Sequence, residues 1–189
     1  MAERVVFHVD ANSAFLSWTA AYKVNVLGEE LDIRTVPSVV AGDKESRHSI
    51  ILAKSVPAKK YGIQTGEPLF KALEKCPDLV IVQPDYELYV EASRHFVDML
   101  RQFSPAVEQY SIDEAWVDMT GTERLWGSPR LAAEKMRSRI FSAASRGLPQ
   151  SRSVPVISTQ ASSMEYCSTT GLNCRSISTK WRLASTYSS

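Results

Sequence analysis

The chain has 189 residues, which is enough for one ordinary domain or two small ones. No apolar run approaches the ~20 residues that span a bilayer, no signal peptide is visible, and the three cysteines lack metal-ligand spacing, so we expect a cytoplasmic protein with no membrane partner. Residues 1–140 hold 17 basic and 20 acidic residues, a net charge of −3, which excludes strong nucleic-acid binding by electrostatic attraction alone.

The first predicted element is a buried strand that ends at a carboxylate. Residues 4–9 form a nearly continuous apolar run, which is typical of a central strand. The run ends at Asp10, a residue type that buried strands normally avoid. Asn12 or Ser13 can cap the helix predicted over residues 14–24. Asp10 therefore either caps this helix or belongs to a functional site at the strand end, and the local sequence leaves both interpretations open.

Short elements occupy the next part of the chain. We predict strands over residues 35–40 and 49–53, helices over residues 54–61 and 68–75, and a buried strand over residues 79–82. The first of these helices is basic, with Pro57 in its first turn, where the missing N–H is tolerated, and Gly62 beyond its end.

The strongest helix signal covers residues 86–103. Its apolar residues fall on one stripe and its charged residues fall elsewhere, so we assign the stripe to core packing and give it no other function. An acidic hairpin over residues 107–118, a turn over residues 119–122 and an amphipathic helix over residues 129–141 follow.

Two adjacent carboxylates, Asp113 and Glu114, lie within the hairpin. Successive side chains of a regular strand point to opposite faces, so the two acids can serve one site only where the chain bends, as it does at a hairpin tip. Carboxylates held close together repel unless a cation lies between them, which points to a divalent metal. The alternative is a solvated turn, in which Asp is common.

The composition changes after Ile140. Residues 141–189 are dense in Ser and Thr, contain no Asp and show no sustained helix or strand period. This composition predicts a disordered Ser-rich tail.

Three motifs, taken together and in this order, resemble one known family. They are Val-Phe-His-Val-Asp-Ala-Asn-Ser-Ala-Phe at residues 6–15, Ala-Lys-Lys-Tyr-Gly-Ile at residues 58–63 and Tyr-Ser-Ile-Asp-Glu-Ala at residues 110–115. They resemble the Y-family translesion DNA polymerases, of the DNA polymerase IV and UmuC type, and the resemblance covers about residues 3–140.

The resemblance implies an α+β fold with a polymerase palm-type mixed or antiparallel sheet, helices on one face, and a small fingers subdomain. The UmuC-type region is then residues 1–140, with the palm at 1–24 and 80–140 and the fingers at 25–79. Residues 141–189 match no part of the family that we can place, which suggests truncation or a reading-frame change after about residue 140. The palm sheet is then expected to lack a further strand.

The resemblance also implies a metal site. Asp10, Asp113 and Glu114 match the metal carboxylates of the family, and Ala11 matches the residue whose backbone carbonyl joins them. Two Mg²⁺ ions are expected at these residues, with Asp113 and Glu114 in the catalytic role.

Two further positions match the nucleotide site of the family. Phe15 falls at the steric gate, a bulky ring that blocks a ribose 2′-hydroxyl. Lys59 occupies the place of a basic residue that holds the triphosphate.

The nucleotide site also departs from the family. The family often has a Thr and a Tyr hydroxyl facing the triphosphate, and Ala53 and Val56 stand at those places, where neither can donate a hydrogen bond. Lys54 and Ser55 lie beside them and are candidate substitutes, and we predict Ser55 as a nucleotide contact.

The implied function is that of a DNA-dependent DNA polymerase in translesion synthesis and DNA repair. Its partners would be primed template DNA and dNTP, with the sliding clamp as a further partner of full-length relatives. The main alternative is a catalytically inert fragment without thumb and little finger. A palm-fold nucleotidyl cyclase also uses carboxylates and two metals, but it has no use for the Lys59 motif or the Phe15 gate.

Overall fold

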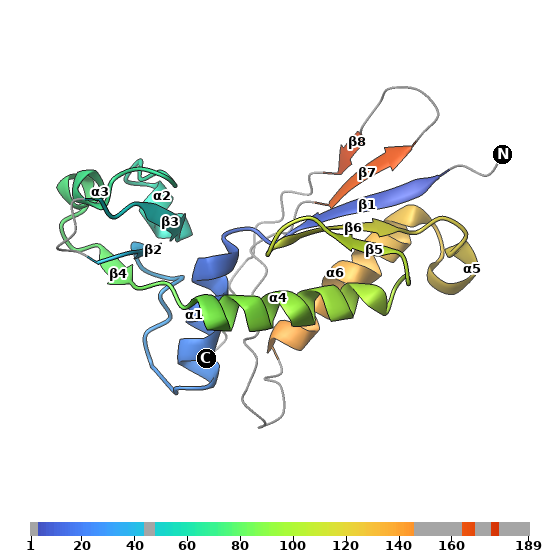
Figure 1. The fold of residues 1–189 in the computed structure, drawn as a ribbon, viewed down its shortest axis with the longest axis horizontal. Helices are drawn as coiled ribbons and strands as arrows, with labels where there is room; N and C mark the ends of the chain where they lie inside the picture. The colour runs from blue at the N-terminus through green and yellow to red at the C-terminus, as the bar shows by residue number, and fades with distance from the viewer. Residues whose placement is uncertain (1–3, 44–47, 146–163, 169–174, 178–189) are drawn as a thin grey trace, which may run out of the picture.

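Two sheets of different size organise the chain (Figure 1). The computed structural model describes the backbone of residues 4–43, 48–145, 164–168 and 175–177, and the side chains of residues 4–43 and 48–140. The strands are β1 (Val5–Asp10), β2 (Ser38–Ala41), β3 (Ile51–Lys54), β4 (Val80–Val82), β5 (Val107–Gln109), β6 (Glu114–Asp118), β7 (Met164–Ser168) and β8 (Arg175–Ile177). The helices are α1 (Ala14–Asn25), α2 (Val56–Lys59), α3 (Leu69–Lys75), α4 (Tyr86–Arg101), α5 (Glu123–Trp126) and α6 (Pro129–Ser145).

The larger sheet has the first strand at its centre. Its order is β5-β6-β1-β7-β8, and β1 pairs antiparallel with β6 on one side and with β7 on the other. Side chains alternate along β1, so that Val5, Phe7 and Val9 are buried whereas His8 and Asp10 are half-buried. The apolar run predicts a strand buried on both faces, but the described helices cover only one face of this sheet (Figure 1).

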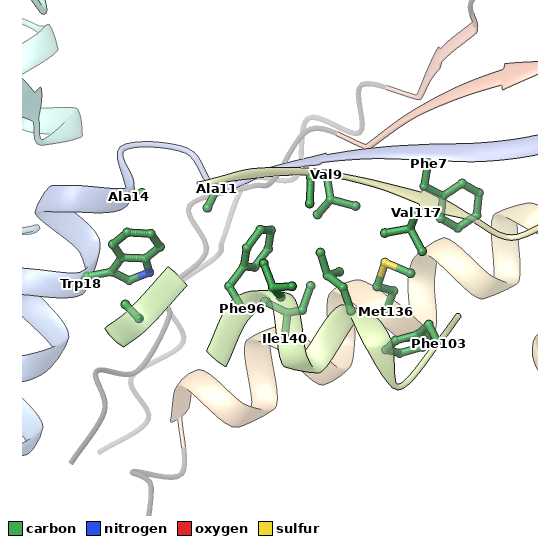
Figure 2. Packing of buried hydrophobic residues seen from close by; sticks show 14 of the residues in the cluster. Phe7, Val9, Ala11, Ala14, Trp18, Phe96, Phe103, Val117, Met136 and Ile140 are labelled. Carbon is green, nitrogen blue, oxygen red and sulfur yellow. The ribbon is translucent and has the colours of Figure 1, made fainter. Parts of the chain in front are cut away.

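Helices α4 and α6 pack against the covered face. Figure 2 shows Phe96 of α4 and Met136 and Ile140 of α6 on the side of the sheet to which Val9 and Val117 point, and all five side chains are buried. Burying a large apolar side chain stabilises the fold by about 1.5–3 kcal/mol. The apolar stripe predicted for the long helix is therefore core packing, as expected.

The smaller sheet has the order β3-β2-β4 and a core of its own. Strand β2 is antiparallel to β3 and parallel to β4, and the core beneath them includes residues from α2 and α3. Helix α1 contacts β2 and β3 on one side and α4 on the other, so it joins the two parts of the molecule.

Strand β4 lies in the smaller sheet, although the sequence predicted it as part of the palm. The division at residues 79 and 80 assigns this strand to the palm, but its backbone pairs with β2, and Val80, Ile81 and Val82 are only half-buried at the edge of the smaller sheet. Strand β4 therefore belongs to the smaller sheet. A short segment cannot reveal its partner, because both sheets accept the same apolar strand.

The chain beyond Ile140 also differs from expectation where the structure describes it. Helix α6 continues to Ser145, and residues 164–168 and 175–177 form β7 and β8, so β1 has a partner at the edge that was expected to lack one. The rest of the predicted disordered tail lies outside the described residues. Among the described helices, none is long and apolar enough to cross a membrane.

Candidate active site

The strand that carries Asp10 and the strand that begins with Glu114 are direct neighbours. Asp10 and Glu114 lie opposite each other in the antiparallel pairing of β1 with β6, so their side chains share a face of the sheet. The backbone N–H of Ala11 donates to the carbonyl oxygen of Asp113 at 2.9 Å, which fixes the end of β1 against the hairpin tip. The structure thus brings Asp10 and Ala11 together with Asp113 and Glu114, which follow more than 100 residues later in the sequence.

The hairpin tip is tight enough to place both acids at its end. The backbone N–H groups of Tyr110 and Ser111 both donate to the carbonyl oxygen of Glu114, at 2.9 and 3.1 Å. The Ser111 hydroxyl donates to the Asp113 carboxylate at 2.8 Å. The bend required for two adjacent acids to serve one site is therefore present, held by backbone hydrogen bonds.

The carboxylates interact electrostatically. Burial raises the pKa of the Asp10 carboxyl above its ordinary value, and the negative charges of Asp113 and Glu114 raise it further, while His8 acts in the opposite sense. A raised pKa means that the site disfavours a third negative charge. A cation among the three groups would remove this repulsion.

The oxygen donors suit Mg²⁺, although the side chains do not form a coordination cluster as they lie. Within the part of the chain with described side chains, no group of three His, Cys, Asp or Glu residues is arranged to hold a metal ion. The Glu114 carboxylate contacts Nε2 of His8, and the Asp113 carboxylate accepts the Ser111 hydroxyl. Carboxylate and carbonyl oxygens are the ligands that Mg²⁺ prefers, so the donor set fits, provided that Glu114 leaves His8.

His8 is a site neighbour that the sequence analysis did not single out. Its ring stacks on Trp116, with ring centroids 4.3 Å apart and an interplanar angle of 28°. His8 and Trp116 are opposite each other on the same face as Asp10 and Glu114. The spacing of two between His8 and Asp10 within a strand is the signal that could have found it, because such residues share a face.

Phe15 lies on α1, close after the site in sequence. Its ring stacks on Tyr89, with centroids 4.4 Å apart and an interplanar angle of 15°. The half-buried ring packs against both the core of the larger sheet and the cluster between α1, β2 and β3. Ser13, two residues before it, has a φ of 51°, a left-handed conformation that is costly for a residue other than glycine.

The helix after Asp10 is not capped as expected. Ser13 stands at the N-cap of α1, as one of the two predicted capping residues, but its side chain makes no capping hydrogen bond. The competing interpretation of Asp10 as a helix cap has no support in the described contacts, in which Asp10 belongs to the pairing with β6.

Ser55, one of the predicted nucleotide contacts, uses its hydroxyl within the protein. Its side chain is fully buried, and its hydroxyl donates to the carbonyl of Val36 at 2.8 Å while accepting from the N–H groups of Ser38 and Ala58 at 3.0 and 3.1 Å. A hydroxyl has one proton and two lone pairs, so no hydrogen-bonding capacity is left for a phosphate. Ser55 is the N-cap of α2.

Lys59 lies at the C-terminal end of α2 and lines an open cavity of about 540 Å³. Lys54, at the end of β3, lines the same cavity together with Gly62, Ile63, Gln64 and Thr65. The structure therefore places the predicted Lys59 in a hollow and adds Lys54 to it.

Comparisons with known proteins agree on one family. The impB/mucB/samB family matches residues 9–151. The chain is 45% identical to DNA polymerase IV of Clostridium acetobutylicum over 152 aligned residues. The aligned region covers 79% of this chain and 38% of that protein. It is 38% identical to DNA polymerase IV of Alkaliphilus oremlandii over 136 aligned residues. This aligned region covers 72% of this chain and 32% of that protein. The chain thus spans about a third of the length of the curated relatives it matches.

Solved structures show the same fold. DinB from Sulfolobus solfataricus superposes with a TM-score of 0.63 at 21% identity, covering 86% of this chain and 42% of that one. An insertion ternary complex of Dbh DNA polymerase superposes with a TM-score of 0.62 at 19% identity, with the same coverage. At such identities the likeness concerns the fold, and it confirms the expected α+β arrangement of a palm-type sheet with a smaller fingers part.

Proposed function

Because this chain belongs to the impB/mucB/samB family, we propose that it is the palm and fingers part of a DNA-dependent DNA polymerase of the translesion type. The observation that carries the proposal is the pairing of Asp10 with Glu114, with Asp113 beside them at the hairpin tip. Asp10 and Glu114 alternate with the buried Val9 and Ala115, so their side chains lie on the opposite face of the sheet. The described helices do not cover that face, and a primer end can approach there (Figure 1).

We assign Asp10, Asp113, Glu114 and the carbonyl of Ala11 as the residues that would hold two Mg²⁺ ions. Ions bound there would stabilise the attacking and leaving oxygens of nucleotidyl transfer. The chain's own contribution is a fixed geometry, because β1 and the hairpin are joined by backbone hydrogen bonds on either side of the acids. His8 holds Glu114 when no ion is bound.

The substrates follow from the same assignment. We propose primed template DNA and dNTP, with Lys59 contacting the triphosphate and Phe15 excluding a ribose 2′-hydroxyl. The stack of Phe15 on Tyr89 supports this role, because a gate must be rigid to discriminate by contact. The clamp partner remains a prediction from the resemblance, and the cytoplasmic location remains a prediction from the cysteines and the N-terminal sequence.

Primer extension tests the proposal. A primed template, dNTP and Mg²⁺ would be incubated with the chain and with Asp113→Ala, and Glu108→Gln serves as the matched control because Glu108 is exposed on the neighbouring strand of the same hairpin. We expect very weak extension at most from this chain, and any extension should be abolished in Asp113→Ala and unchanged in Glu108→Gln. Extension that survives Asp113→Ala contradicts the assignment.

A paired measurement separates the proposal from the inert-fragment alternative. Binding of Mn²⁺, an analogue of Mg²⁺ with a paramagnetic signal, would be followed by electron paramagnetic resonance in the same three proteins. Metal binding that depends on Asp113 without any primer extension favours the inert fragment. Such a result is expected if the rest of the relatives' length supplies the grip on DNA, because a displacement of ~1 Å can cost ~100-fold in rate.

A further inference from the structure

We infer that Lys54 is a second residue that binds the polyphosphate of the incoming nucleotide, acting with Lys59 across the cavity between β3 and the segment that follows α2. The inference rests on the proposed function and adds to it a residue at which the resemblance places no contact. Two lysines facing one hollow form a site for an anion that carries more than one charge.

The geometry of the cavity is the first observation. Lys54 and Lys59 line it from different elements, and residues 62–65 complete its wall. Lys54 is anchored by the pairing of β3 with β2, in which it lies opposite Val39. Lys59 ends a helix that Ser55 caps from inside the core. Both ammonium groups therefore extend from fixed backbone.

The charges in the cavity are the second observation. Burial lowers the pKa of Lys54, and the positive charges of Lys59 and Lys75 act in the same direction while Glu67 opposes them. Glu67 is already engaged, since its carboxylate pairs with Nζ of Lys75 at 2.6 Å and accepts the N–H of Gln64 at 3.0 Å.

Neither lysine has an acid of its own. Among the side chains that the structure describes, no ion pair involves Lys54 or Lys59. Two ammonium groups that repel each other and lack an acid are stabilised by an anion that bridges them.

The residues next to Lys54 explain why a second cation is needed. Ala53 is buried and Val56 is exposed, and neither offers a hydrogen-bond donor to a phosphate. The hydroxyl of Ser55 is saturated within the core. Lys54 stands between these positions and lines the cavity, and its ammonium group carries three N–H donors, so it can supply the contacts that its neighbours cannot.

Phosphate could also reach the cavity as part of a nucleic-acid strand. The lining of the cavity holds only two basic residues, which favours a compact polyphosphate, because a strand needs a track of basic residues along its length. The test therefore compares the two sources.

Isothermal titration with inorganic tripolyphosphate, without metal and without DNA, tests the inference on the 189-residue chain. We expect Lys54→Gln to weaken binding about tenfold and Lys54→Arg to retain it within about threefold, because Arg keeps the positive charge and its N–H donors whereas Gln loses the charge. Lys60→Gln is the matched control, since Lys60 is exposed beside Lys59 but does not line the cavity. A single-stranded dT oligonucleotide is titrated in parallel, and we expect Lys54→Gln to leave its binding unchanged.

Three outcomes overturn the inference. They are absence of tripolyphosphate binding by the unmodified chain, equal binding by Lys54→Gln, and a loss in Lys54→Gln confined to the oligonucleotide. The proposed polymerase function is tested separately, because Asp113→Ala should abolish primer extension while binding tripolyphosphate like the unmodified chain. A failed titration beside Asp113-dependent extension would therefore reject Lys54 and keep the polymerase.

Discussion

The imidazole Nε2 of His8 contacts the Oε1 oxygen of Glu114 across the pairing of β1 with β6, joining residues 106 positions apart in sequence. The contact occupies one of the carboxylates that would bind metal, and stacking on Trp116 fixes the imidazole ring. The metal binding proposed for this site would therefore compete with a protein contact, and the side chains around the acids would influence the affinity for the ion.

Removal of His8 should strengthen metal binding. In His8→Ala, Glu114 no longer has a competing partner, and a net hydrogen bond of about 1 kcal/mol corresponds to about fivefold in affinity. Mn²⁺ titration by electron paramagnetic resonance would measure the change, with His95→Ala on α4 as the control. Weaker metal binding by His8→Ala would show instead that His8 positions Glu114 for the ion.

Asp10 should lower stability at neutral pH. Its pKa is raised in the folded chain, so the folded state favours the protonated form; stability is highest below the ordinary Asp pKa and falls as pH rises through the folded value. Asp10→Asn removes the repelling charge, and we expect a melting temperature higher by a few degrees at pH 7, where about 1 kcal/mol corresponds to about 2–4 °C.

The gain in melting temperature of Asp10→Asn should disappear at a pH below 3.8, the ordinary pKa of an Asp carboxyl. At such a pH Asp10 is protonated in both the folded and the unfolded state. Thermal unfolding at both pH values would measure this difference. The control is Asp98→Asn, whose exposed carboxylate lies on α4 in a pair with Arg101. An equal gain in melting temperature at both pH values would mean that Asn stabilises position 10 through packing and not through removal of the charge.

Phe15→Ala should affect stability and sugar selection together. Loss of the stack on Tyr89 and of contacts with both apolar clusters should reduce the free energy of unfolding by about 1–3 kcal/mol, less than for a fully buried Phe. Urea unfolding would measure this loss in the free energy of unfolding. The matched control is Phe70→Ala, whose side chain is half exposed on α3.

The gating role of Phe15 requires a second measurement. In an extension assay, Phe15→Ala should raise the ratio of ribonucleotide to deoxyribonucleotide incorporation, while Phe70→Ala should not. A destabilised Phe15→Ala with unchanged sugar discrimination would make residue 15 a packing residue only.

Ser55→Ala should be among the most destabilising hydroxyl deletions in the chain. It leaves two buried N–H groups, of Ser38 and Ala58, and the half-buried carbonyl of Val36 without their partner, and we expect a loss of about 2–4 kcal/mol. Thr35→Ala is the control, because the Thr35 hydroxyl makes one exposed hydrogen bond to Asp32 and should cost less than about 1 kcal/mol. Equal unfolding midpoints in urea would contradict the capping role of Ser55.

Local sequence determined the elements and the positions of the acids. The long helix α4, the acidic hairpin and the basic helix before Gly62 follow from periodicity, capping residues and turn residues, all of which act over a few positions. The three motifs added the family, because their residues and order are specific. These features are readable without coordinates since each depends on contacts within one segment.

Only the tertiary structure decided which segments meet. The pairing of β4 with β2 placed that strand in the smaller sheet, and three hydrogen bonds from separate segments made Ser55 a buried cap. The contact of His8 with Glu114 and the hollow shared by Lys54 and Lys59 have the same origin. Pairing and packing between distant segments depend on which arrangement of the whole chain buries the most apolar surface and leaves the fewest polar groups unpaired, and no local pattern encodes that balance.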